Sequence, residues 1–205
     1  MTDFTDPQTV WNQRFSTPEY LFGETPNAFL ASQALRLGQG RALALADGEG
    51  RNSVWLAQQG FAVDAFDFSA PAVAKAKALA EKNGVTVNFQ CCDWQSFDWQ
   101  PAQYNLVAGI FFQFAGPQQR DVLFQKMDQA LKPGGILLIQ GYGKDQLKYN
   151  TGGPGKFDHL YDEALLKQAF SGYEVLVSQT YEAILEEGSR HKGTSALVGF
   201  VARKP

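Results

Sequence analysis

Two glycines and two acids stand together in the sequence, in the order Asp47-Gly48-Glu49-Gly50. Glycine lets the backbone turn tightly, and it lets a ligand approach the main chain without meeting a Cβ. The helix predicted to begin near Asn52 presents free N–H groups at its first turn. This arrangement is typical of a loop that holds a small ligand against the backbone.

Two further acids follow the next two apolar runs of the sequence. Asp67 lies 19 residues after Gly48, close to the ~20-residue offset at which nucleotide-binding units place the acid that bonds the ribose. Asp93 is placed to accept a hydrogen bond from the exocyclic amine of adenine, and Phe68 and Trp94 could sandwich the base. The alternative is that each acid only caps the helix or turn that follows it.

The charge of the glycine loop distinguishes between classes of nucleotide. A dinucleotide fold seats its pyrophosphate with the spacing G-x-G-x-x-G, whereas only G-x-G is present here. Asp47 and Glu49 would repel a pyrophosphate, and they would attract an ammonium or a sulfonium group. The sequence therefore predicts S-adenosylmethionine as the cofactor.

Strands and helices alternate along the chain and must position these residues. Strands are predicted at 41–46, 61–66, 86–91, 104–110, 136–140, 174–181 and 195–203. Helices are predicted at 7–15, 26–38, 52–59, 71–83, 118–131 and 161–170, and a polar loop at 186–193. The alternation favours right-handed βαβ units in a mainly parallel sheet, and unbroken apolar runs are typical of strands covered on both faces. Ligands of such sheets bind beyond the carboxyl ends of the strands, where the loop and both acids lie.

Composition narrows the classes of function. A length of 205 residues is consistent with one domain, and a net charge of −3 disfavours nucleic acid as a partner. Cys91 and Cys92 are adjacent and offer neither a disulfide framework nor a metal-ligand spacing, so no metal is expected. The start of the sequence lacks a signal-peptide pattern, and the longest apolar run, 106–112, is too short for a membrane helix. We therefore expect a cytoplasmic protein with a small-molecule substrate and no membrane partner, while its oligomeric state is not predicted.

The stretch 43–50 resembles the glycine motif of the class I S-adenosylmethionine-dependent methyltransferases. In the same comparison, Asp67 resembles the ribose-binding acid of that family, and Asp93-Trp94 its adenine-contact motif. Residues 131–135 resemble the turn before its fifth strand. The resemblance implies a Rossmann-like α/β fold. Its seven-stranded, mostly parallel sheet would have the order 3-2-1-4-5-7-6, with the last strand antiparallel and helices on both faces.

Two positions of the loop depart from the family pattern. Ala46 stands where the first glycine is usual, and Ala44 stands where an acid is common. The change at Ala44 removes one indirect contact to the methionine amine, for which Asp47 or Glu49 could compensate. The resemblance implies the following cofactor-binding residues: Arg14, Ala46, Asp47, Gly48, Glu49, Gly50, Asn52, Asp67, Phe68, Asp93, Trp94 and Ile110.

Within this family, residues 51–61 are similar to the small bacterial methyltransferases grouped with tellurite-resistance and thiopurine enzymes. The lead-in segments 11–15 and 19–27 and the segment 149–154 are similar to that group too. By this resemblance Arg14 reaches the methionine carboxylate, and pairing with a surface acid is the alternative. The implied organisation is a single methyltransferase domain over 1–205, with a helical N-terminal cap (1–40), a cofactor-binding half (41–140) and a substrate-side half (141–205).

Strands four, five and six of this topology would all end on the cofactor side of the sheet. The candidates to bind or deprotonate an acceptor there, if they do not simply face solvent, are Tyr149, His159, Arg190 and His191. The apolar, aromatic residues after strand four favour a small or soft acceptor. The predicted function is methyl transfer from S-adenosylmethionine to a small molecule, with a sulfur or chalcogen nucleophile favoured. The alternatives are a non-catalytic S-adenosylmethionine-binding protein and, less favoured, a nucleotide-dependent oxidoreductase.

Overall fold

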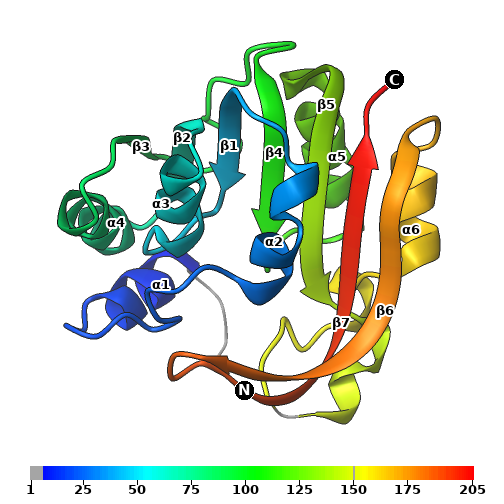
Figure 1. Ribbon diagram of the computed structural model, residues 1–205. Helices are drawn as coiled ribbons and strands as arrows, with labels where there is room; N and C mark the ends of the chain where they lie inside the picture. The colour runs from blue at the N-terminus through cyan, green and yellow to red at the C-terminus, as the bar shows by residue number, and fades with distance from the viewer. Residues whose placement is uncertain (1–6, 150) are drawn as a thin grey trace.

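Seven strands pair in one sheet, in the order β3-β2-β1-β4-β5-β7-β6 (Figure 1). The computed structural model describes residues 7–149 and 151–205. The strands are β1 (Arg41–Leu45), β2 (Ala62–Asp67), β3 (Val87–Cys91), β4 (Tyr104–Ile110), β5 (Leu131–Tyr142), β6 (Glu174–Glu187) and β7 (His191–Arg203). The first five pair in parallel, and β7 runs antiparallel to both β5 and β6. The expected strand order and the antiparallel last strand are confirmed.

Helices cover both faces of this sheet (Figure 1). The helices are α1 (Pro7–Phe15), α2 (Ala28–Ser32), α3 (Arg51–Gln58), α4 (Ala70–Lys82), α5 (Pro117–Ala130) and α6 (Glu163–Ala169), with 3-10 helices η1 (Ala34–Arg36), η2 (Lys144–Lys148) and η3 (Phe157–His159). None of the described helices is long and apolar enough to cross a membrane.

Side-chain alternation along β1 divides the core into two layers. Leu43 and Leu45 lie in a buried cluster with Met127 of α5, whereas Ala42 lies in a second cluster with Leu56 of α3. Successive side chains of a strand point to opposite faces of the sheet, so each layer takes every second residue of β1. The sheet is thereby held rigid on both sides, and its C-terminal edge is left to position the loops.

The predicted helix at 26–38 is shorter than expected and starts elsewhere. Asn27 is the N-cap of α2, because its side-chain oxygen accepts a hydrogen bond from the Leu30 N–H at 3.0 Å. The α-helix ends at Ser32, and the separate turn η1 follows it. At the other end of the chain, Asn150 of the segment 149–154 lies outside the described residues.

The last two strands are longer than the sequence predicts. Pairing between β6 and β7 continues to Glu187 and His191, so the polar loop expected at 186–193 is mostly strand. Pairing between β5 and β7 stops at Leu197, and the rest of the hairpin forms a two-stranded arm (residues 182–195). Figure 1 shows this arm curving below the C-terminal edge of the sheet, toward α1.

The tip of the arm closes on the lead-in segment between α1 and α2. The Ser189 N–H donates to the Leu21 carbonyl at 2.9 Å, and Arg51 Nη1 of α3 donates to the Phe22 carbonyl at 3.1 Å. Gly188 has a φ of +65°, and a Cβ there would lie 2.1 Å from the Leu21 oxygen. The arm can therefore reach the lead-in segment only with glycine at its tip.

We expect Gly188→Ala to destabilise the protein by about 1–3 kcal/mol more than Gly84→Ala. Both glycines have a φ of +65°, but nothing lies within 4 Å of a Cβ added at Gly84. The control therefore carries the same backbone strain without the clash with Leu21. Urea unfolding of the two variants measures the difference, and equal losses would show that the arm does not depend on this contact.

Candidate active site

Asp67 ties the end of β2 to the glycine loop that follows β1. Its Oδ2 accepts a hydrogen bond from the Gly48 N–H at 2.9 Å, and its Oδ1 accepts one from the Ser69 N–H at 2.9 Å. The residue is only 6% exposed. Each carboxylate oxygen has a second lone pair, so the group can still accept from ligand hydroxyls. The predicted ribose-binding acid is thus already held at the edge of the loop.

Asp47 supports the first turn of α3. Its carboxylate accepts a hydrogen bond from the Ser53 N–H at 3.3 Å and another from the Ser53 hydroxyl. Because α3 leaves its first N–H groups without intrahelical partners, this carboxylate acts as a cap. The loop before it turns through left-handed conformations at Ala46 (φ +49°), Gly48 (φ +61°) and Gly50 (φ +90°).

Burial raises the pKa of both loop carboxyls. Desolvation raises the pKa of Asp47 to about 7, and the nearby Asp67 adds to that rise. Desolvation likewise raises the pKa of Asp67 to about 6, against the opposing hydrogen bonds from Ser69 and Gly48. A cation placed beside the loop would favour the ionised form of both groups. The loop therefore gains from a positively charged ligand.

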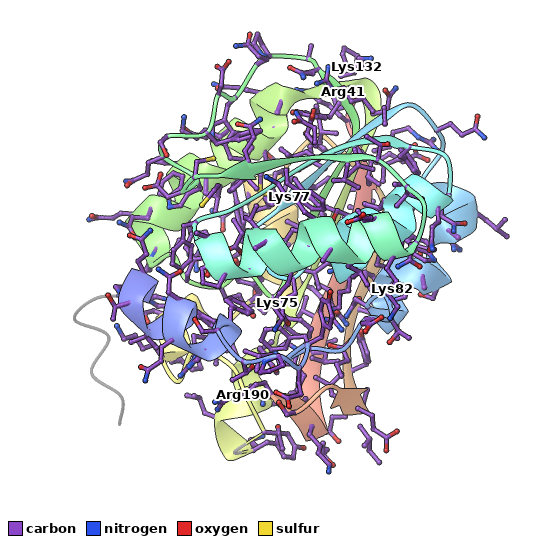
Figure 2. The ribbon with its side chains drawn as sticks, turned by 90° about the vertical axis from the view of Figure 1, so that its left-hand side faces the viewer. Arg41, Lys75, Lys77, Lys82, Lys132 and Arg190 are labelled. Carbon is purple, nitrogen blue, oxygen red and sulfur yellow. The ribbon has the colours of Figure 1, made fainter. Side chains whose placement is uncertain are left out.

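Glu49 contributes less negative charge to the loop than the sequence suggests. It is 3% exposed, and its Oε1 lies 2.5 Å from Lys75 Nζ. Lys75 belongs to α4 and is labelled in Figure 2. The same ammonium donates to the Glu19 carbonyl and lies 5.1 Å from the centre of the Tyr20 ring. Lys75 therefore balances Glu49, and the attraction for a cation rests on Asp47 and Asp67. The second oxygen of Glu49, Oε2, is buried and has no hydrogen-bond partner among the described residues.

Asp93 caps the turn that follows β3, which is the alternative that the sequence left open. Its Oδ1 accepts hydrogen bonds from the Gln95 and Ser96 N–H groups at 2.9 and 2.8 Å, and these bonds lower the pKa of the carboxyl. Asp93 remains exposed, so capping does not prevent contact with a ligand. Trp94, which follows Asp93, packs partly against the core, and Phe68, which follows Asp67, is half-buried.

Arg14 lies at the other side of the loop, on the last turn of α1. Its guanidinium stands over the Trp11 ring at 4.8 Å. Burial lowers the pKa of Arg14, and the charge of Arg190 on the arm lowers it further. Two arginines that lie close enough to interact would both be relieved by an anionic group between them.

A small cavity opens between the carboxyl ends of β1 and β4. Its volume is about 10 Å³, which is room for about one water molecule. The cavity is lined by Ala44, Leu45, Ala46, Asp47, Asn52, Ala108 and Ile110. These include four of the predicted cofactor residues, so the structure brings them together. Phe15 of α1 covers the loop, since a Cβ added at Gly48 would lie 3.6 Å from its ring.

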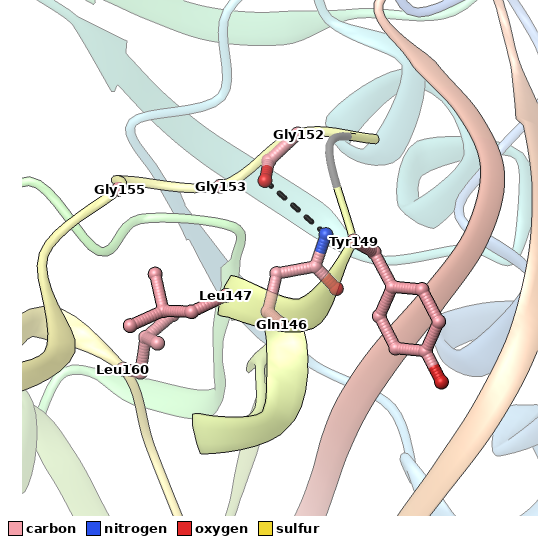
Figure 3. Close-up of a pocket in the computed structure, with 7 residues that line it drawn as sticks. All are labelled: Gln146, Leu147, Tyr149, Gly152, Gly153, Gly155 and Leu160. Atoms are coloured by element: carbon pink, nitrogen blue, oxygen red, sulfur yellow. Dashed lines mark hydrogen bonds between the residues drawn. The ribbon is translucent and has the colours of Figure 1, made fainter.

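The predicted acceptor-binding residues lie in different surroundings. The Tyr149 hydroxyl donates to Glu182 at the surface, and His159 Nδ1 lies 3.2 Å from the Gln113 carbonyl. A hollow of about 400 Å³ lies beside Tyr149, over the segment 146–160 (Figure 3). Of the two predicted histidines, His191 lies against aromatic rings, with the ring centres of Phe22 and Phe111 each 4.4 Å from its own.

Three residues near His191 were not predicted as site residues. Glu187 accepts hydrogen bonds from Arg51 Nη2 at 2.8 Å and from Asn27 Nδ2 at 3.0 Å. His191 Nδ1 lies 3.1 Å from the same carboxylate. Arg51 and Asn27 stand in motifs that the sequence analysis compared with known enzymes, but their partner lies in the segment predicted as a polar loop. Among residues 7–149 and 151–205, no group of three or more potential ligands could hold a metal ion.

Residues 42–135 match a family model described as a methyltransferase domain. The matched residues include the glycine loop, Asp67 and Asp93, so this part of the chain is similar to methyltransferases. The match supports S-adenosylmethionine as the cofactor, which the acidic loop predicted, and the sheet has the strand order expected from the resemblance to the class I enzymes. The chain is 32% identical over 125 residues to the tRNA 5-carboxymethoxyuridine methyltransferase of Escherichia coli, a match that covers 58% of this chain and 47% of that protein. The chain thus spans about half the length of this relative.

Two solved structures share the fold of the methyltransferase domain over nearly the whole chain. TehB from Haemophilus influenzae superposes with a TM-score of 0.70 and 18% identity, covering 97% of this chain and 67% of that one. A structure described for conversion of a disulfide bond into a thioacetal group during echinomycin biosynthesis superposes with a TM-score of 0.76. It is 15% identical and covers 97% of this chain and 92% of that one. At these identities the likeness concerns the fold.

We expect Asp67→Asn to gain stability relative to the wild type as pH rises from about 4 to about 7, without cofactor. Wild-type Asp67 keeps its proton in the folded state after the unfolded chain has lost its own, so the free energy of unfolding falls across this window. A shift of about two pKa units corresponds to on the order of 3 kcal/mol. Asparagine does not ionise and lacks this loss.

Urea unfolding of the wild type and the variant across this pH range measures the effect. If asparagine loses a hydrogen bond, the free energy of unfolding of the variant falls by the same amount at every pH. The readout is therefore how the difference in unfolding free energy between variant and wild type changes with pH. The control is Asp121→Asn, because Asp121 is an exposed acid on α5. Parallel curves for the wild type and Asp67→Asn would contradict the raised pKa.

Proposed function

We propose that the protein transfers a methyl group from S-adenosylmethionine to a small-molecule acceptor. The observation that carries this proposal is the buried Asp67 carboxylate, fixed by the Gly48 and Ser69 N–H groups beside the acidic loop. A carboxylate in this place suits the two hydroxyls of a ribose, and the loop around it favours a positively charged nucleoside. The methyltransferase-domain match over 42–135 supports the same conclusion.

The remaining cofactor contacts follow from the positions of the side chains. Asp93 would accept from the adenine amine, with Phe68 and Trp94 beside the base. Asp47 and the backbone of Ala46 would face the methionine amine, and Arg14, near Arg190, would take the methionine carboxylate. A bound S-adenosylmethionine supplies a methyl group that its sulfonium already activates. The chain's own contribution is alignment, which reaches ~7–11 kcal/mol in well-oriented reactions.

A soft acceptor, such as a sulfur or chalcogen nucleophile, is the favoured substrate class. Phe22, Phe111 and Tyr142 form an aromatic wall around His191, and such a wall suits an apolar, polarisable group. The structural neighbour from echinomycin biosynthesis also acts on sulfur, which supports this choice. Tyr142 and His191 belong to the expected substrate-side half (141–205), whereas Phe22 and Phe111 come from earlier parts of the chain.

Transfer RNA is the second candidate acceptor. The relative from Escherichia coli is named as a tRNA methyltransferase and is 32% identical over the matched region. The net charge of −3 argues against an extended contact with RNA. Release of S-adenosylhomocysteine in the presence of bulk tRNA, compared with small thiols, phenols, amines, selenite and tellurite, distinguishes the two candidates.

We expect calorimetry to show binding of S-adenosylmethionine and S-adenosylhomocysteine, and no binding of NAD. Asp67→Ala should weaken the affinity for S-adenosylmethionine and for S-adenosylhomocysteine by about 10- to 100-fold, because hydrogen bonds to a charged group contribute ~1.5–3 kcal/mol. Asp121→Ala should leave both affinities unchanged.

Unchanged affinity in Asp67→Ala would remove the ribose assignment. Binding of NAD in place of S-adenosylmethionine would overturn the proposed function in favour of an oxidoreductase. Cofactor binding without turnover of any acceptor would leave a non-catalytic binding protein.

A further inference from the structure

Glu187 of the arm holds a buried charge cluster together. Its Oε2 lies 2.8 Å from Arg51 Nη2 and 3.1 Å from His191 Nδ1, and the side chains of the three residues are only 7–12% exposed. These contacts keep the pKa of Glu187 at about 2, although burial alone would raise it. The carboxylate is therefore ionised at neutral pH and accepts hydrogen bonds from both partners.

This contact fixes which nitrogen of His191 carries the proton. Burial lowers the pKa of His191 below its ordinary value, and Glu187 opposes that shift only in part. The ring is therefore neutral at neutral pH. Since Glu187 can only accept, Nδ1 must carry the hydrogen, and Nε2 is left with a free lone pair. Nε2 has no hydrogen-bond partner among the described residues.

The rest of the His191 surroundings is aromatic. The ring centres of Phe22 and Phe111 each lie 4.4 Å from that of His191, and Tyr142 meets it edge-on at 5.8 Å. Tyr142 is 3% exposed, and its hydroxyl is buried with no partner among the described residues. An unpaired buried hydroxyl costs free energy unless a ligand satisfies it. Two polar atoms that lack partners, Nε2 and this hydroxyl, thus stand in one apolar wall.

This wall adjoins the cofactor cavity. Phe111 directly follows Ile110, which lines the cavity at the end of β4. From the other side, the Asn27 N–H donates to Asn52 Oδ1 at 2.9 Å, and Asn52 also lines the cavity. Asn27 is in turn bonded to Glu187. The arm therefore links His191, through Glu187 and Asn27, to a residue that lines the cavity.

We propose that His191 is the general base for the methyl acceptor, that Glu187 is its positioning residue, and that the acceptor is a small thiol or phenol. The inference rests on the proposed methyltransferase function. His191 Nε2 takes the S–H or O–H proton of the acceptor, and the freed electron pair forms the bond to the methyl carbon. The bond from that carbon to the sulfonium breaks, its electron pair stays on sulfur, and S-adenosylhomocysteine is released. The imidazolium, stabilised by Glu187, then returns its proton to water.

The protonation state of His191 gives the first test, and it needs no acceptor. NMR of the ¹⁵N-histidine-labelled protein with S-adenosylhomocysteine, assigned with His159→Gln, should show the neutral Nδ1–H tautomer of His191 and a pKa below the ordinary 6.5. The titratable or charged groups that face His191 are Glu187 from β6, Arg51 from α3 and Tyr142 from β5. Glu187→Gln removes the contact that raises this pKa, so the pKa should fall further. A protonated ring at neutral pH, or the Nε2–H tautomer, would overturn the proposal.

Turnover gives the second test, with benzenethiol, phenol, selenite and tellurite as probes. Wild-type protein should release S-adenosylhomocysteine with benzenethiol or phenol, and kcat should rise with pH through the pKa of His191 to a plateau. His191→Gln should lower kcat by about 10²- to 10⁴-fold, and His159→Gln, the same change in the other histidine, should not. Glu187→Gln should lower kcat less and move the rising limb to lower pH.

Calorimetry on the same proteins separates this proposal from the proposed function. If S-adenosylmethionine binds equally well to the wild type and to His191→Gln, the loss of kcat belongs to the chemical step. Equal kcat in the wild type and His191→Gln would overturn the role of His191, and so would turnover of the oxyanions alone or of no probe at all. Failure of the wild type to bind S-adenosylmethionine would instead overturn the proposed function.

Discussion

The buried ion pair between Arg51 and Glu187 determines how the parts of the site lie relative to one another. Its two members are 136 residues apart in the sequence, one at the start of α3 and the other near the tip of the arm. Arg51 also bonds the Phe22 carbonyl, and Glu187 also bonds Asn27, so the pair joins the lead-in segment as well. Removing one member of a buried pair costs ~3–5 kcal/mol, because the other charge is left uncompensated. The position of the arm therefore depends on this ion pair as well as on the Ser189–Leu21 hydrogen bond at its tip.

The glycine loop selects its ligand with fewer charges than its composition suggests. Lys75 balances Glu49, and Asp47 spends part of its hydrogen-bonding capacity on Ser53. Asp47 and Asp67 remain, and burial brings the pKa of each close to neutrality. Their ionisation is thus coupled to whatever charge lies beside them. The preference for a cation comes from the burial of the Asp47 and Asp67 carboxyls. The number of acidic residues in the loop does not by itself account for it.

Much of the fold could be predicted from the sequence because its signals are local. The strand at 104–110 is a continuous apolar run with clear ends, and the structure has β4 over Tyr104–Ile110. The extension of β6 and β7 could not be predicted, because residues 186–193 are polar and glycine-containing and resemble a loop, and the apolar Leu185 before them packs against distant residues such as Tyr142 and Leu160. Gly193 also resembles a loop residue in the sequence, although it lies in β7 and pairs with Leu185.

The positions of the candidate site residues at the strand ends could be predicted from the sequence, whereas the surroundings of His191 could not. Strand ends gave Asp67 and the loop, since parallel strands bring their carboxyl ends to one edge. His191 appeared in the sequence as one of several polar residues near a turn. Its distinction comes from Glu187, four residues earlier across the hairpin, and from aromatic rings in three distant segments. No sequence pattern indicates that these distant residues come into contact.

The place of β7 in the sheet has a consequence for how the protein is made. This strand, the last in sequence, sits between β5 and β6 and pairs with both. Until it has left the ribosome, β5 has an open edge and β6 has no neighbour to join. A nascent chain can pair its first five strands through contacts of shorter range. The aromatic wall around His191 can form only once β7 is present. The glycine loop and the aromatic surroundings of His191 are therefore completed at different moments of synthesis.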